Sequence, residues 1–150
     1  MVSAKDQDTV TGARGMEVTM DEKLSEIDDQ CDLVVLPGGI PGVPNLKANS
    51  KVQAMVKAQN DRGGYVAAIC AGPTALGAFG VLADKNATCY PGCENQLMAK
   101  RHSTEPVVVD GNVITSRGVG TAIEFALKLV EILIDRQTAD DLAEKIVYKR

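Results

Sequence analysis

Continuous apolar runs and helically spaced apolar residues alternate along this chain. The runs at 31–36 and 65–70 end in the turn residues Pro37-Gly38-Gly39 and in Cys70-Ala71-Gly72. Apolar runs of this length that stop at turn residues are typical of strands buried on both faces, and therefore of parallel strands. The pattern predicts a parallel sheet covered by helices on both faces.

The other segments are assigned by their period and turn residues. Asp110-Gly111 joins two β-branched runs and predicts a hairpin over 107–116. The remaining expectations are helices over 49–63, 73–83, 94–101, 120–134 and 138–146, a helical turn over 24–27, and short strands over 2–20 and 86–89.

Three sharp junctions follow predicted strands, at 37–39, 70–72 and 115–120. In open parallel sheets, ligands bind beyond the carboxyl ends of the strands. We therefore expect the three junctions to meet and to form the functional site.

Cys70 stands at the corner between a predicted strand and a predicted helix, with small residues on both sides. A thiol held on such a turn lies close to the helix N-terminus, where free N–H groups favour the thiolate. The pattern alone also fits a second interpretation, in which Cys70 is a small buried apolar residue.

Composition narrows the function classes. The chain has 150 residues, which predicts one domain over 1–150, and its net charge of −4 with 3% aromatic residues argues against nucleic-acid backbones as partners. No apolar run is long enough to span a bilayer, so the expected location is the cytoplasm. Cys89 and Cys93 are spaced C-x₃-C without a second pair, which predicts no metal site.

Three stretches together resemble the ThiJ/PfpI superfamily: "LPGGIPGVPNL", "GGYVAAICAGPTAL" and "ITSRGVGTAIEFALKLVEIL". They are most similar to the branch that contains the Parkinsonism-associated deglycase, and the resemblance runs from about Val2 to the C-terminus. It implies a flavodoxin-like three-layer α/β/α sandwich with a mostly parallel sheet. It also implies a homodimer without a metal or an organic cofactor.

The resemblance also implies the residues of the site. Cys70 would be the reactive thiol, and the N–H groups of Gly39 and Ala71 would form an anion hole. The other residues implied to line the pocket are Gly38, Tyr90, Arg14 and Arg117.

This chain departs from the family pattern in two places. Tyr90 stands where many relatives place a histidine, and His102 falls too far along the chain to replace it. The family's first strand and helix are lacking, and with them the glutamate that serves as general acid/base. Because that strand would be central, its two neighbours are expected to have unpaired backbone groups.

The function that the resemblance implies is a cysteine-dependent glyoxalase or protein deglycase. Its substrates would be methylglyoxal-type 2-oxoaldehydes or their adducts on protein side chains, with nucleic acid only as a glycated substrate. The alternative is a non-catalytic oxidative-stress sensor or redox-regulated chaperone that uses oxidation of Cys70. Peptide hydrolysis is disfavoured because Ala71 occupies the position of the peptidase histidine. Cys89 and Cys93 are candidates for a resolving thiol that pairs with Cys70.

Overall fold

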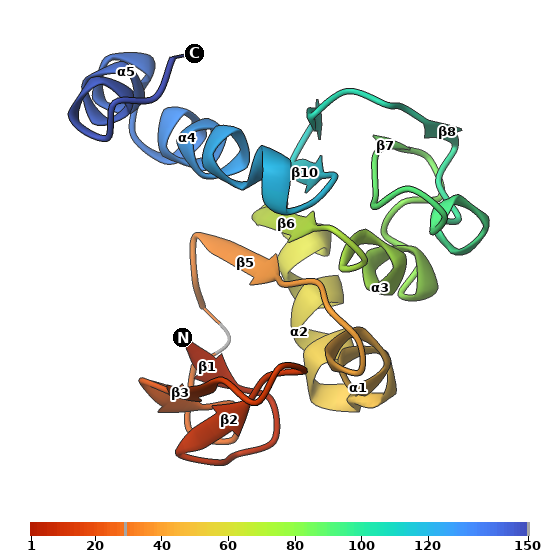
Figure 1. Cartoon of the computed structure of the whole chain (residues 1–150). Coiled ribbons are helices and arrows are strands. Elements are labelled where there is room, and N and C mark those ends of the chain that lie inside the picture. Colours follow the sequence, from red (N-terminus) through yellow and green to blue (C-terminus); the bar gives the residue numbers. More distant parts are fainter. Residues whose placement is uncertain (29, 150) are drawn as a thin grey trace.

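The computed structural model describes residues 1–28 and 30–149. Its main sheet has the strand order β5-β6-β10-β9. Figure 1 labels β5, β6 and β10. The strands are β5 (Leu33–Leu36), β6 (Tyr65–Ile69), β10 (Val113–Ser116) and β9 (Val107–Asp110). β5, β6 and β10 are parallel and β9 is antiparallel to β10, so three strands end at the same edge of the sheet.

Helices cover the main sheet from both sides (Figure 1). α1, α2 and α3 pack on one face and α4 on the other, while α5 packs against α4. Their bounds are α1 (Gly42–Ala48), α2 (Ser50–Asp61), α3 (Pro73–Ala78), α4 (Ala122–Leu133) and α5 (Arg136–Lys145). The predicted α/β class with a mostly parallel sheet is therefore confirmed.

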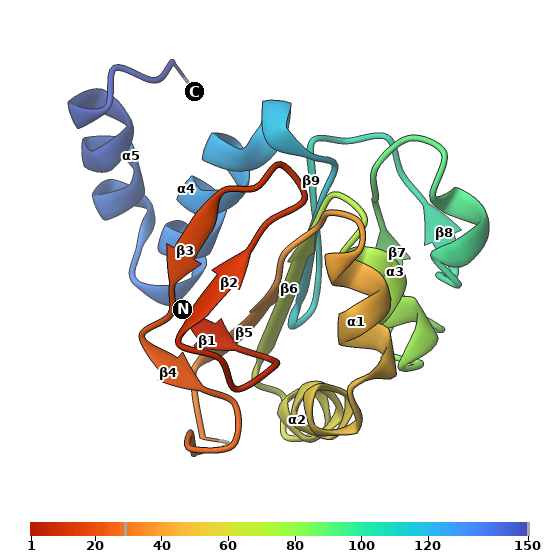
Figure 2. The same ribbon diagram turned by 60° about the horizontal axis from the view of Figure 1, so that its bottom comes forward.

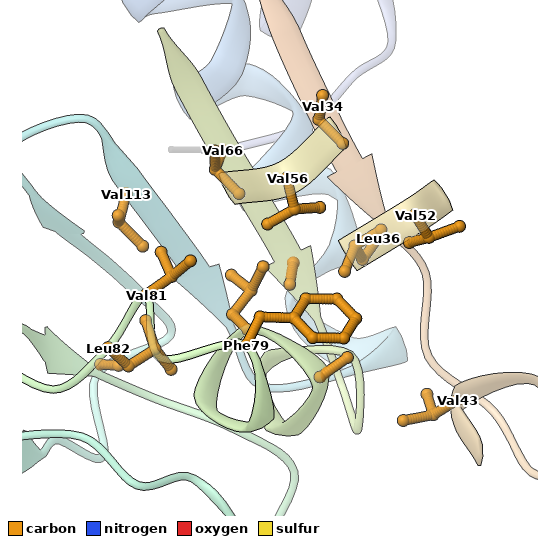
Figure 3. Packing of buried hydrophobic residues seen from close by; sticks show 14 of the residues in the cluster. Val34, Leu36, Val43, Val52, Val56, Val66, Phe79, Val81, Leu82 and Val113 are labelled. Atoms are coloured by element: carbon orange, nitrogen blue, oxygen red, sulfur yellow. The ribbon is translucent and has the colours of Figure 1, made fainter. Parts of the chain in front are cut away.

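The two faces of the sheet are buried to different extents. The larger core joins the sheet to α1, α2 and α3, and Val56, Val66 and Leu82 are fully buried in it (Figure 3). The smaller core, under α4, has three buried members: Ala67, Ile114 and Phe125.

Among the described residues, β5 pairs with a strand on one side only. Its partner is β6, and Val35, which alternation directs to the α4 side of the sheet, is 43% exposed. The N-terminal strands lie beyond β5 in small sheets of their own, β1 with β4 and β2 with β3 (Figure 2). Their bounds are β1 (Val2–Ser3), β2 (Thr9–Thr11), β3 (Glu17–Thr19) and β4 (Glu22–Lys23).

The helix predicted over 94–101 is wrong. A 3₁₀ turn, η1 (Glu94–Gln96), ends before Met98, whose φ of 50° is incompatible with a right-handed helix. The chain then forms β8 (Arg101–His102), which pairs with β7 (Asn86–Ala87). Pairing between distant segments overrides the local helical pattern here.

Two other helices differ from their predictions. α1 was not predicted because prolines flank and interrupt its first turn, at Pro41 and Pro44, although proline is tolerated there. α3 ends at Ala78, earlier than predicted, because Gly80 turns the chain with a φ of 82°. Among the described residues, no helix has the length and apolarity needed to cross a membrane.

Candidate functional site at the Cys70 corner

Cys70 forms the sharp corner between β6 and α3. Its φ of 64° lies in the left-handed region, which is uncommon for a residue with a side chain. The Cys70 N–H donates to the Ser116 carbonyl at 3.0 Å, and the Cys70 carbonyl accepts from the Tyr90 N–H at 2.8 Å. The strained corner is therefore held by the end of β10 on one side and by the segment after β7 on the other.

Two glycines allow the loop after β5 to approach this corner. A Cβ at Gly38 would lie 2.6 Å from the Cys70 Cβ and 3.1 Å from its Sγ. A Cβ at Gly72 would lie 2.7 Å from the Leu36 carbonyl oxygen. The Cys70 sulfur consequently lies against Gly38, and the first two predicted junctions do meet.

Backbone N–H groups near the thiol are available as donors. Among the described residues, neither the Gly39 N–H nor the Ala71 N–H has a hydrogen-bond acceptor. The Thr74 hydroxyl donates to the Ala71 carbonyl at 2.7 Å, which fixes the start of α3. Two unused donors that flank a thiol can stabilise an oxyanion formed beside it.

The third junction carries Arg117 and contacts Tyr90, whose backbone N–H donates to the Cys70 carbonyl. A Cβ at Gly118 would lie 3.3 Å from the Tyr90 ring, so the ring packs against this glycine. The Arg117 guanidinium donates to the Thr104 carbonyl at 3.3 Å, and its Nε is buried without a hydrogen-bond partner in the described part of the chain. Arg117 thus keeps one unused donor.

The remaining predicted residues are placed differently. Arg14 is exposed in the turn between β2 and β3, and no interaction among the described residues joins it to Cys70. His102 is exposed on β8.

Hydrogen bonds from the N–H groups of Glu94 and Gly92 lower the pKa of Glu94, and the charges of His102 and Arg117 also contribute. Among residues 1–28 and 30–149, no carboxylate hydrogen-bonds to the Cys70 thiol.

One hollow of the described surface is not lined by Cys70. It measures about 680 Å³ and lies between the β7–β8 pair and β9, bounded by residues that include Asn86, His102 and Val108. Within the described ranges, no cluster of three or more His, Cys, Asp or Glu side chains could hold a metal ion. We place the site at the corner because strain, unused donors and a thiol coincide there.

Sequence reasoning missed the groups that hold the corner in place. The Ser116 hydroxyl lies 2.7 Å from that of Thr121 and donates to the Pro106 carbonyl, which positions the Ser116 carbonyl against Cys70. The register of the 107–116 hairpin could have placed Ser116 at the strand end, but no local signal indicates its contact with Cys70.

Cys89 is a second thiol near the corner, and it is fully buried. Burial raises the pKa of the Cys89 thiol from 9.0 to about 11, and the neighbouring Cys93 sulfur adds to the shift. The protonated thiol is therefore the form that the fold favours.

This shift predicts a loss of stability in alkali. In the unfolded chain Cys89 ionises first, so the free energy of unfolding falls as the pH rises from 9.0 towards about 11. The loss from this group is at most about 2–3 kcal/mol. Urea unfolding of wild type and Cys89→Ala, at pH values below, between and above the two pKa values, measures it. Between pH 9.0 and about 11, the free energy of unfolding should fall more for wild type than for Cys89→Ala, by up to about 2–3 kcal/mol. An equal fall in both proteins would refute the prediction.

Known proteins are similar to this chain in sequence and in fold. The DJ-1/PfpI family profile matches residues 1–132. A Parkinson disease protein 7 homolog of Danio rerio is 40% identical over 95% of this chain and 78% of its own length. Glutathione-independent glyoxalase DJR-1.2 of Caenorhabditis elegans is 34% identical over 89% of this chain and 73% of its own length.

Solved structures agree with these relatives. Oxidized Toxoplasma gondii DJ-1 superposes with a TM-score of 0.94 at 33% identity, over 99% of this chain and 82% of that one. Drosophila melanogaster DJ-1beta gives a TM-score of 0.90 at 37% identity, over 95% of this chain and 78% of that one. These neighbours confirm the flavodoxin-like fold expected from the resemblance. The chain therefore belongs to the DJ-1/PfpI family.

Proposed function

We propose that this protein is a cofactor-free glyoxalase or protein deglycase that uses the Cys70 thiolate as its nucleophile. The proposed substrates are methylglyoxal-type 2-oxoaldehydes and their adducts on protein side chains, handled in the cytoplasm by a homodimer. The observation that carries the proposal is the left-handed Cys70 corner flanked by the unused N–H groups of Gly39 and Ala71. A relative named as a glutathione-independent glyoxalase supports the substrate class.

The corner suits attack on an aldehyde. The Cys70 sulfur adds to the aldehyde carbon, a C–S bond forms, and the carbonyl electron pair moves onto oxygen. The N–H groups of Gly39 and Ala71 would stabilise that oxyanion, and Arg117 would supply a further positive charge. A base then moves the proton from the aldehyde carbon to the neighbouring carbon, and water releases lactate from the resulting thioester.

The base is the part of the site for which we assign no residue. The glutamate that the family resemblance implies has no counterpart in contact with Cys70 among the described residues. Tyr90 packs against Gly118, and it stands where many relatives place a histidine, so no histidine base is available at that position.

Methylglyoxal consumption in the absence of glutathione tests the proposal. We expect the wild-type protein to consume methylglyoxal and to release an equal amount of lactate. Prior alkylation of the protein with iodoacetamide should abolish both, because the nucleophile is blocked. Consumption without lactate, or activity that survives complete alkylation of Cys70, would overturn the proposal.

A second candidate function is a non-catalytic oxidative-stress sensor or redox-regulated chaperone. The absence of a carboxylate at the Cys70 thiol, among the described residues, favours it because turnover lacks a proton carrier. Mild peroxide should then add two oxygen atoms to Cys70, which intact mass and peptide mapping detect. A protein whose Cys70 stays unmodified under these conditions is not such a sensor.

A further inference from the structure

A tight turn separates Cys89 from Cys93. The Cys93 N–H donates to the Tyr90 carbonyl at 3.0 Å, and Gly92 has a φ of 92°. Proline at the second position and a glycine of positive φ at the third are typical of a type II turn, which brings the Cα atoms of Tyr90 and Cys93 within about 7 Å. The Glu94 carboxylate accepts from the Gly92 N–H at 2.8 Å and fixes the turn further.

Both thiols contact the larger core. Cys89 is fully buried in the larger core, and Cys93 packs against that core while remaining partly accessible. The Tyr90 ring packs against Gly118 instead, and the Cys70 sulfur lies against Gly38. Cys89 therefore shares its surroundings with Cys93, whereas the Cys70 sulfur faces a different loop.

The electrostatic effects on Cys89 agree with this arrangement. Burial is the largest cause of its raised pKa, and among the neighbouring charges Cys93 acts more strongly than Cys70. Two thiols that contact the same core can be bridged if their Cα atoms come within about 4.4–6.8 Å of each other.

We infer that Cys89 and Cys93 form a redox-active dithiol that closes into an intrachain disulfide without consuming Cys70. The oxidant is a low-molecular-weight disulfide such as oxidised glutathione. This modification is independent of the proposed function, and it differs from the pairing with Cys70 that the sequence suggested.

The exposures of the two thiols determine which of them reacts first with oxidised glutathione. The accessible Cys93 thiolate attacks one sulfur of oxidised glutathione, a mixed disulfide forms, and one glutathione thiolate leaves. Cys89 then loses its proton to solvent and attacks the Cys93 sulfur, which expels the second glutathione. Two protein thiols are oxidised, and one glutathione disulfide is reduced to two thiols.

Peptide mapping after oxidation tests the inference. Wild-type protein is incubated with oxidised glutathione, quenched in acid, alkylated and digested without reductant. We expect a bridge between Cys89 and Cys93, with two hydrogen atoms lost from the intact mass and Cys70 not part of the bridge. A bridge that contains Cys70, or stable glutathione adducts without a bridge, would overturn the inference.

Cysteine variants separate the two steps. Cys70→Ser and Cys31→Ser should still form the bridge, whereas Cys89→Ser should stop at a glutathione adduct on Cys93. Cys93→Ser, which replaces the partly accessible thiol and leaves the core intact, should form neither the bridge nor the adduct at that turn. If Cys70→Ser loses the bridge while circular dichroism shows a native fold, the dithiol does not act alone.

Discussion

Cys70→Ser is expected to reduce methylglyoxal consumption to the rate measured without protein, a loss of at least about a thousandfold. Serine keeps the size of the side chain, so the corner should persist. Its hydroxyl is a far weaker acid than a thiol, and among the described residues no hydrogen-bonded base contacts position 70 to activate it. The measurement is lactate formation from methylglyoxal under conditions in which substrate is saturating for wild type.

Cys31→Ser is the matched control for this experiment. Cys31 is another free, partly buried thiol, and its Sγ lies 3.8 Å from the Gln59 Oε1 near the start of β5. Because Cys70 follows the carboxyl end of β6, the two thiols lie towards opposite ends of parallel strands. We expect wild-type activity from Cys31→Ser. Equal rates for Cys70→Ser and wild type would rule out Cys70 as the nucleophile.

Gly77→Ala is expected to destabilise the protein by about 2–3 kcal/mol. An added methyl group at Gly77, within α3, would overlap the Leu97 carbonyl oxygen and lie 2.8 Å from the Leu97 carbonyl carbon. Alanine raises helix propensity by about 1 kcal/mol, but a collision with backbone in a buried contact outweighs that gain. Urea unfolding measures the change as a lower midpoint.

Gly42→Ala provides the comparison, since it makes the same change in α1 where a methyl group would meet no atom within 4 Å. This variant should be as stable as wild type or slightly more stable. If Gly77→Ala unfolds at the same urea concentration as Gly42→Ala, then α3 does not pack on the Leu97 segment as described.

Much of the fold could be predicted because its signals are local. The apolar runs that became β5 and β6 and the Asp110-Gly111 turn between β9 and β10 each depend on a few adjacent residues. The segment at 94–101 could not be predicted in this way, because Arg101 and His102 pair with a strand about fifteen residues earlier.

The candidate site shows the same division. The Cys70 corner and its small neighbours are visible in the sequence, and the structure brings Gly38 and the Ser116 carbonyl to it as the convergence of strand ends predicts. The left-handed φ of Cys70 and the unused Nε of Arg117 depend on distant contacts, so no local pattern reveals them. The roles of Gly39, Ala71, Arg14 and Arg117 in binding an anion stay predictions.

The one-sided pairing of β5 among the described residues also affects how readily the protein aggregates at high concentration. An unpaired strand edge presents N–H and C=O groups that can form backbone hydrogen bonds with an extended segment of another molecule. Here that edge carries the half-exposed Val35, so two copies brought together gain backbone bonds and apolar contact at once. The modest net charge of −4 offers little long-range repulsion against such contact at physiological salt. We therefore expect the edge of β5 (Leu33–Leu36) to favour aggregation at high protein concentration.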